Sequence, residues 1–154
     1  MTEWRQGEYV ISTERVDAVA AHAFLTARYW SPGIPLETVE RAIRGSLCFS
    51  LWHEPAGGPS AQVGFARMIT DRATFGYLAD VYVLEAHRGR GLAKWMMRVV
   101  VEHPELQGFR RWCLATRDAH GLYAQFGFKP LATPDRWMER WTPDVYGPVP
   151  TTKL

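Results

Sequence analysis

The sequence predicts one α+β (mixed α/β) domain, because hydrophobic periodicities of two and of about 3.6 residues alternate along the chain. In the first half, two apolar runs at 47–52 and 62–69 flank the turn cluster PAGGPS, which predicts an antiparallel hairpin. In the second half, strand-like and helix-like segments alternate. The 154 residues suffice for one such domain and leave no room for two.

Before the hairpin, the chain predicts a strand and two helices. Tyr9 to Ile11 form the first apolar run, and Ser12 and Thr13 are candidate helix caps. Apolar residues at helical spacing then share one face: Val16, Val19, Ala20, Ala23, Phe24 and Ala27. Two prolines and a glycine in 30–35 end this helix, and a second short helix is predicted over 36–45.

After the hairpin, five further elements are predicted. They are a strand at 74–84, a helix at 91–102, a strand at 110–116, a helix at 119–126 and a strand at 128–131. Trp137 and Trp141, four residues apart, fit a short turn or a final strand that closes the sheet. The segment from 143 to 154 holds three prolines and is expected to be irregular.

Composition excludes several classes of protein. Hydrophobic residues make up 47% and charged residues 22%, which is ordinary for a globular domain and unlike a disordered chain or a coiled coil. The formal net charge of +2 is too balanced for a dedicated nucleic-acid binder. Two cysteines and scattered histidines give no metal-ligand pattern. Without a signal peptide or a long apolar run, we expect a cytoplasmic protein with no membrane partner.

The segment most informative about chemistry is DVYVLEAHRGRGLAKW, residues 80–95. A buried strand is followed by a loop with Gly89 and Gly91, and a helix starts directly after them. Free N–H groups at a helix start favour an anion, and glycines allow close backbone approach. Arg88, Arg90 and Lys94 add positive charge. The pattern predicts an anion cradle, although the glycines could merely turn the chain beside solvated basic residues.

Two familiar phosphate-binding patterns are missing. The chain has no GxxxxGK[ST], which excludes a nucleotide P-loop, and no GxGxxG with an acidic residue about 20 positions on. Instead, Arg88-Gly-Arg-Gly91-Leu-Ala93 resembles the R/Q-x-x-G-x-G/A motif of the GNAT superfamily of acetyl-CoA-dependent N-acetyltransferases. A second segment, Ala119-His-Gly-Leu-Tyr123-Ala-Gln-Phe-Gly127-Phe128, is similar to the family's A-x-x-L-Y-x-x-x-G-F. The resemblance runs from about residue 8 to 141 and implies a mostly antiparallel sheet of six to seven strands with about four helices.

The resemblance also implies a role for individual residues. Backbone contacts to the cofactor are implied for Val81 and Val83 on the strand before the loop. Pyrophosphate binding is implied for the loop and the helix start: Arg88, Gly89, Arg90, Gly91, Leu92 and Ala93. Tyr123 matches the tyrosine that can protonate the departing thiolate, or else it is a core aromatic. Thr116 stands where many relatives carry an asparagine that contacts the cofactor, and its reach is shorter.

The acceptor side of the site is less defined by the sequence. Tyr77 stands where some relatives carry an acidic base, so Asp80 is the candidate base, with a structural hydrogen bond to a neighbouring loop as the alternative. In the loop after the first helix, Tyr29 and Trp30 could form an aromatic wall and Arg28 could hold an acceptor carboxylate. Equally, Tyr29 and Trp30 could cap the core.

These observations predict a single enzyme domain over residues 1–154 that moves an acetyl group from acetyl-CoA to a primary amine. We expect this amine to belong to a small molecule. We expect direct attack in a ternary complex, because no activated nucleophile is visible. We expect no metal. The alternatives are a non-catalytic acyl-CoA-binding or sensing module, and a transferase acting on a protein or aminoacyl-tRNA amine. A homodimer is left open.

Overall fold

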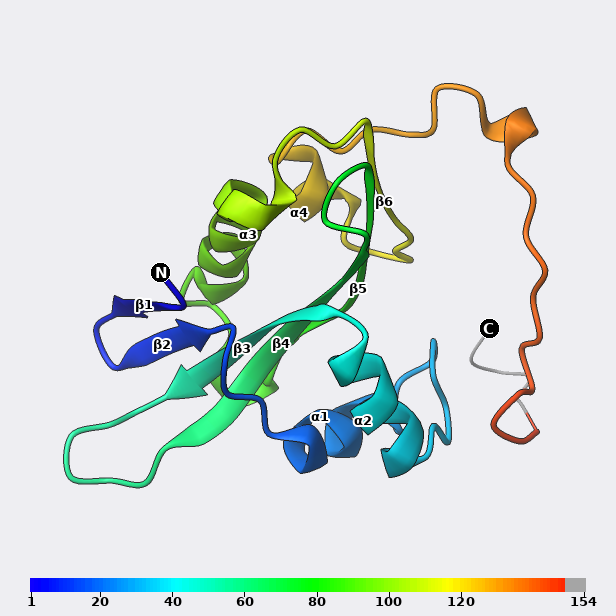
Figure 1. The fold of residues 1–154 in the computed structure, drawn as a ribbon. Coiled ribbons are helices and arrows are strands. Elements are labelled where there is room, and N and C mark those ends of the chain that lie inside the picture. Colours follow the sequence, from blue (N-terminus) through cyan, green and yellow to red (C-terminus); the bar gives the residue numbers. More distant parts are fainter. Residues whose placement is uncertain (149–154) are drawn as a thin grey trace.

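A computed structural model describes residues 1–148, and residues 149–154 of the predicted irregular tail lie outside that description. One sheet of six strands in the order β1-β2-β3-β4-β5-β6 forms its centre (Figure 1). All neighbouring strands pair antiparallel except β5 and β6, which are parallel. The strands are β1 (Glu3–Gln6), β2 (Tyr9–Ser12), β3 (Leu47–His53), β4 (Ala61–Thr70), β5 (Phe75–Val83) and β6 (Arg111–Leu114). The mixed, mostly antiparallel sheet confirms the predicted fold class.

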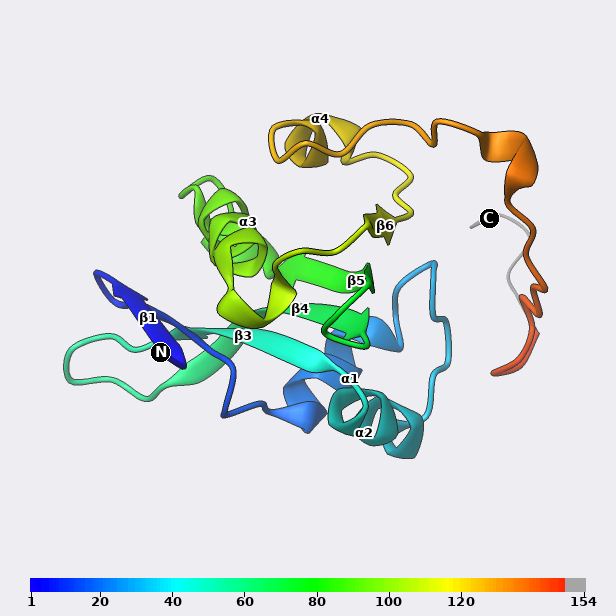
Figure 2. The same cartoon turned by 45° about the horizontal axis from the view of Figure 1, so that its top comes forward.

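Helices cover both faces of this sheet. Helices α1 (Ala18–Leu25) and α2 (Leu36–Arg44) lie on one face, and α3 (Leu92–Glu102) and α4 (His120–Ala124) on the other (Figure 2). Three short 3₁₀ turns complete the ordered elements: Glu85–His87, Pro104–Leu106 and Pro134–Arg136. Within residues 1–148, no helix is long and apolar enough to cross a membrane. The same residues contain no cluster of three or more His, Cys, Asp or Glu that could hold a metal ion.

The core lies on both faces because β3 and β4 are buried on both. Along β3, Phe49 and Leu51 pack in the same cluster as α3, whereas Cys48 faces the α1–α2 side with Phe65. Alternation of side chains along a strand produces this division. Helix α3 contributes its apolar face, with Leu92, Met96 and Val100 nearly inaccessible to water.

A bulge in β5 opens the sheet. Phe65 pairs with Tyr82 and Arg67 pairs with Ala79, so one residue of β4 opposes two of β5. Asp80, in the bulge, has a φ of 56°, which bends the strand. The parallel pairing with β6 ends at Leu78 and Leu114. The edge of β5 from 79 to 83 is therefore free on the β6 side.

Three local predictions are wrong or incomplete. Residues 128–131 form no strand, because Phe128 turns back to donate its N–H to the Tyr123 carbonyl and Pro130 has no N–H to contribute. Strand β1 was not predicted, since its mostly exposed polar residues carry no apolar periodicity. Of the two alternatives for Trp137, the final strand does not form: Trp137 ends the 3₁₀ turn Pro134–Arg136, where its N–H donates to the Pro134 carbonyl at 3.1 Å, and its ring lies under the Arg111 guanidinium at 5.0 Å.

Candidate functional site

A cavity of about 850 Å³ opens where β5 leaves β6. Its wall combines the end of β5, the residues after β6, the start of α3, α4 and the loop between α1 and α2. Most of the predicted site residues line it: Arg28, Tyr29, Trp30, Asp80, Val81, Val83, Arg88, Ala93, Thr116 and Tyr123. The tertiary structure thus brings together residues that the sequence separates by more than 90 positions.

The other predicted cofactor residues do not line the cavity. Gly89, Arg90 and Gly91 are exposed in the loop before α3, while Leu92 is buried in the core below. Gly89 and Gly91 have φ values of 78° and 75°, and no atom lies within 4 Å of a Cβ built at either position.

The loop presents a row of unbonded N–H groups. Trp95 is the first residue of α3 whose N–H is bonded, to the Gly91 carbonyl at 3.0 Å. Within residues 1–148, no acceptor faces the N–H groups of positions 89–94. The helix dipole and these donors favour an anion at this point. The Arg88 side chain turns inward and donates from Nε to the Val83 carbonyl at 2.9 Å, which fixes the loop to the end of β5.

The free edge of β5 offers a second kind of binding surface. Between positions 79 and 83 the strand is hydrogen-bonded on its β4 side only. Backbone N–H and C=O groups at such an edge can pair with an extended amide-containing ligand. Val81 and Val83 lie on this edge, and Val83 already uses its carbonyl for Arg88.

Tyr123 presents a free hydroxyl to the cavity. The residue is 8% exposed, and its ring packs edge-on against Phe128 with centroids 6.0 Å apart. Its hydroxyl makes no hydrogen bond to any described residue. Burial, followed by the nearby Tyr29 and Asp118, raises the pKa of Tyr123 to about 12. At neutral pH the hydroxyl is therefore protonated and able to donate.

Thr116 connects β6 to α4. Its Oγ1 accepts a hydrogen bond from the Ala119 N–H at 3.1 Å, which holds the turn before the helix. The hydroxyl proton is left for another partner in the cavity. Thr116 can therefore donate to a ligand.

Asp80 is held by two donors from opposite sides. Its Oδ1 accepts from Trp30 Nε1 at 3.0 Å, and its Oδ2 accepts from Arg67 Nε at 2.8 Å. The Asp80 and Arg67 side chains are only 12% and 17% exposed. Arg67 also donates to the Ser46 hydroxyl at 3.2 Å. The contacts match the alternative of a structural bond to a neighbouring loop, since Trp30 belongs to the loop between α1 and α2.

Cations and aromatic rings alternate around that loop. The Arg28 guanidinium lies 4.6 Å from the Phe24 ring and 5.4 Å from the Trp30 ring. The Arg117 guanidinium lies 4.0 Å from the Tyr29 ring, and Tyr29 meets Trp30 edge-on at 5.1 Å. These rings form one wall of the cavity.

Several lining residues were missed by the sequence analysis. Phe24, stacked on Tyr82 at 3.8 Å, carries only the signal of a helix core position in the sequence, and Arg117 belongs to neither motif. Trp141, Pro143 and Tyr146 reach the cavity from the C-terminal segment, which runs away from the sheet and returns beside the α1–α2 loop (Figure 1). The aromatic residues of that segment are the feature of the sequence that could have indicated its contact with the cavity.

Comparison with known proteins assigns the fold and the motifs to one family. Residues 45–130 match the model of the acetyltransferase (GNAT) domain. A candidate acetyltransferase of Gibberella zeae is 36% identical over 142 residues, covering 79% of each chain.

Solved structures agree with this match. A candidate GNAT-family acetyltransferase from Xanthomonas campestris pv. campestris is 48% identical, with a TM-score of 0.83 over 90% of this chain and 96% of that one. An acetyltransferase from Clostridium acetobutylicum, solved with acetyl-CoA, shares the fold at 18% identity, with a TM-score of 0.60 over 86% and 94% of the two chains.

Proposed function

Because this chain belongs to the GNAT acetyltransferase superfamily, we propose that it transfers the acetyl group of acetyl-CoA to a primary amine of a small molecule. One observation carries the proposal: a single cavity joins the free edge of β5, the start of α3 and the Tyr123 hydroxyl. The β5 edge and the start of α3 can hold acetyl-CoA, and the Tyr123 hydroxyl can assist departure of the coenzyme A sulfur.

The loop before α3 suits the pyrophosphate of coenzyme A. Its positive-φ glycines keep side chains out of the space above the unbonded N–H groups, and Arg90 and Lys94 are exposed beside it. Val81 and Val83 on the β5 edge would bind the amide groups of the pantetheine arm, and the Thr116 hydroxyl would donate to it. Acetyl-CoA, when bound, supplies a thioester carbonyl.

The reaction follows from what the chain offers around that carbonyl. The neutral amine attacks the carbonyl carbon, the C–N bond forms, the C–S bond breaks, and the amine proton ends on the thiol. An N–H of the β5 edge would stabilise the oxyanion. No cysteine lines the cavity, and burial raises the pKa of the Cys48 thiol to about 12, so direct attack is favoured over a covalent intermediate.

Tyr123 would assist by hydrogen bonding. With its pKa near 12, full proton transfer to an alkyl thiolate of pKa about 8.5 is uphill by about 5 kcal/mol. A buried O–H aimed at the developing thiolate still stabilises it. Tyr123 would therefore accelerate the reaction without being indispensable.

For Asp80, the contacts favour holding Trp30 and Arg67 over removing the amine proton. Both carboxylate oxygens already accept a hydrogen bond, one of them from a guanidinium. Each oxygen therefore already holds a neighbouring side chain in place. We therefore assign Asp80 as a positioning residue and the amine proton to water in the cavity.

Cofactor binding can be tested with two glycine variants of matched strain. Gly91→Ala places a Cβ in the cradle, whereas Gly57→Ala introduces the same substitution at a φ of 74° in the β3–β4 turn, with nothing within 4 Å. Each substitution costs about 1–2 kcal/mol of backbone strain. We expect calorimetry to show a loss of acetyl-CoA affinity of at least about tenfold for Gly91→Ala and none for Gly57→Ala.

Turnover is tested separately, by thiol release from acetyl-CoA with a panel of primary amines. In the binding experiment, equal losses of acetyl-CoA affinity in Gly91→Ala and Gly57→Ala would refute the role of the loop before α3 as an anion cradle. Binding of acetyl-CoA without release of thiol for any amine would refute the transferase and leave an acyl-CoA-binding module.

A further inference from the structure

The charged residues of the cavity carry an excess of positive charge. Four arginines and two aspartates line it: Arg28, Arg67, Arg88, Arg117, Asp80 and Asp118. Each aspartate is accompanied by an arginine. Asp80 pairs with Arg67 at 2.8 Å, and Asp118 lies 3.9 Å from Arg117. Asp80 is therefore engaged inside the cavity, and Asp118, exposed beside Arg117, is the more weakly paired carboxylate of the described lining.

Among these four arginines, Arg28 has the fewest polar partners. Its guanidinium makes no hydrogen bond or ion pair with any residue of the part described, 1–148, and its Nε is buried without a partner. Leaving a buried donor unsatisfied is unfavourable, and such groups call for an explanation. The terminal nitrogens, held against Phe24 and Trp30, are available for a planar anion at the cavity wall.

The surroundings of Arg28 are apolar. The rings of Phe24 and Trp30 contact the Arg28 guanidinium, and Tyr29, Ile34 and Ile43 also line the cavity. A ligand that fills this space needs an apolar or aromatic body in addition to its anion.

We propose that the acceptor is an amino acid with an apolar or aromatic side chain, whose carboxylate binds Arg28 and whose amine receives the acetyl group. This proposal rests on the proposed function and specifies its substrate. The products are the N-acetyl amino acid and the free thiol, with the amine proton passing to the thiol. The positive lining also disfavours the ammonium form, so the neutral nucleophile is favoured once the carboxylate is seated.

Polyamines, aminoglycosides and lysine side chains fit the same cavity poorly. Each would bring one or more ammonium groups next to arginines, while the buried carboxylate of the described lining, Asp80, is already paired with Arg67. A phosphate-bearing amine shares the negative charge of an amino acid. The guanidinium fork matches phosphate as well as carboxylate, but a small phosphate-bearing amine brings no apolar body for the space beside Arg28.

The test is a set of matched acceptors. Phenylalanine is compared with phenylalaninamide, which has no carboxylate charge, and with phenethylamine, spermidine and O-phosphoethanolamine, by thiol release from acetyl-CoA. We expect phenylalanine to be acetylated at least about tenfold more efficiently in kcat/KM than each of the other four amines, which corresponds to one charge-assisted contact.

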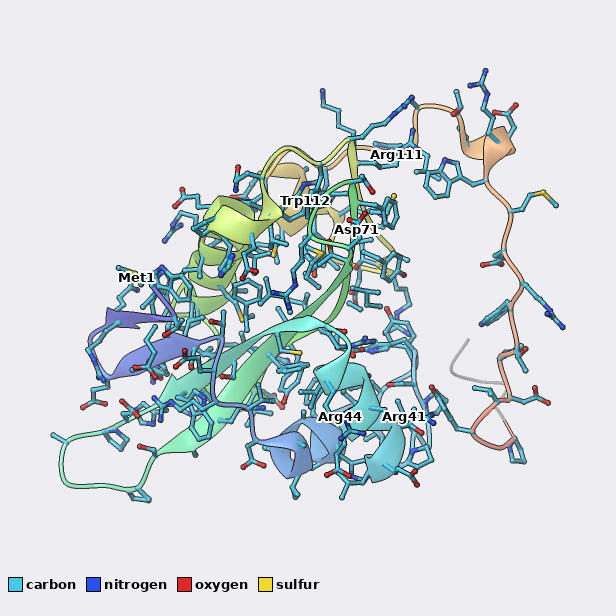
Figure 3. The ribbon with its side chains drawn as sticks, in the orientation of Figure 1. Met1, Arg41, Arg44, Asp71, Arg111 and Trp112 are labelled. Atoms are coloured by element: carbon cyan, nitrogen blue, oxygen red, sulfur yellow. The ribbon has the colours of Figure 1, made fainter. Side chains whose placement is uncertain are left out.

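Two variants assign the preference to Arg28. Arg28→Met should raise KM for phenylalanine about 10–100-fold and change KM for phenylalaninamide less than about threefold. Arg44→Met is the control, because Arg44 is an exposed arginine of α2 that does not line the cavity (Figure 3). It should leave both values unchanged.

The outcomes separate the two proposals. Preferred acetylation of phenylalaninamide, phenethylamine, spermidine or O-phosphoethanolamine would overturn the amino-acid assignment while leaving the transferase standing. If no amine is acetylated although acetyl-CoA binds, the transferase fails. The anion site is then tested by calorimetric titration of N-acetylphenylalanine into the complex of the protein with coenzyme A. The site is refuted if the Arg28→Met variant binds N-acetylphenylalanine as tightly as the unaltered protein does.

Discussion

Replacing Asp80 by Asn should destabilise the protein measurably, because it removes one partner of a buried ion pair. The substitution keeps an oxygen that can accept from Trp30 and tolerates the φ of 56°, but it leaves the Arg67 guanidinium uncompensated. Breaking a buried pair costs about 3–5 kcal/mol. Since the two side chains retain 12% and 17% exposure, we expect about 2–3 kcal/mol, or a Tm lower by roughly 5–10 °C.

Urea unfolding of Asp80→Asn, Arg67→Met and the double variant measures this energy. The double variant should lose at least about 1.5 kcal/mol less than the sum of the two single losses, because neither partner is then left alone. Asp118→Asn is the matched control. Its pair with Arg117 is 3.9 Å long and exposed, so its effect should stay within about 0.5 kcal/mol. A loss below about 0.5 kcal/mol for Asp80→Asn would refute the reasoning.

Two further variants test the site and the core. Tyr123→Phe should lower kcat about 10–100-fold with acetyl-CoA affinity and Tm unchanged, because the hydroxyl bonds no described residue; an unaltered kcat would leave the ring as packing only. Burial lowers the pKa of His103 below its usual 6.5, and its neutral Nδ1 accepts from the Glu105 N–H at 3.1 Å. The unfolded chain therefore binds the proton more readily, and stability should fall as the pH drops below about 6.5. His103→Asn keeps an acceptor and should flatten the fall in Tm between pH 7.5 and 5.5, whereas parallel curves would contradict this role.

Strongly periodic segments were predictable, and weakly periodic ones were not. The apolar runs of β3, β4 and β5 and the amphipathic α3 were placed within a few residues from their side-chain spacing. The polar edge strand β1 carried no such pattern and depends on pairing with β2 through the turn at Gly7, whose φ is 59°. Conversely, the apolar residues at 128–131 suggested a strand, although Phe128 packs against Tyr123 instead.

The sequence by itself determined the nature of the cradle. Glycines at 89 and 91, basic neighbours and a following helix are local features, so their chemistry can be read without knowing the rest of the fold. The pattern around Tyr123 was equally local, and together the two motifs indicated the family.

Only the tertiary structure decided what surrounds the acceptor. The bulge at Asp80 separates β5 from β6, and the resulting cavity brings Arg28 and Trp30 to the same wall as Tyr123. Whether a charge such as that of Asp80 is free or paired depends on a partner 13 residues away on another strand. Electrostatic pairing depends on distance in space, which spacing along the chain does not determine.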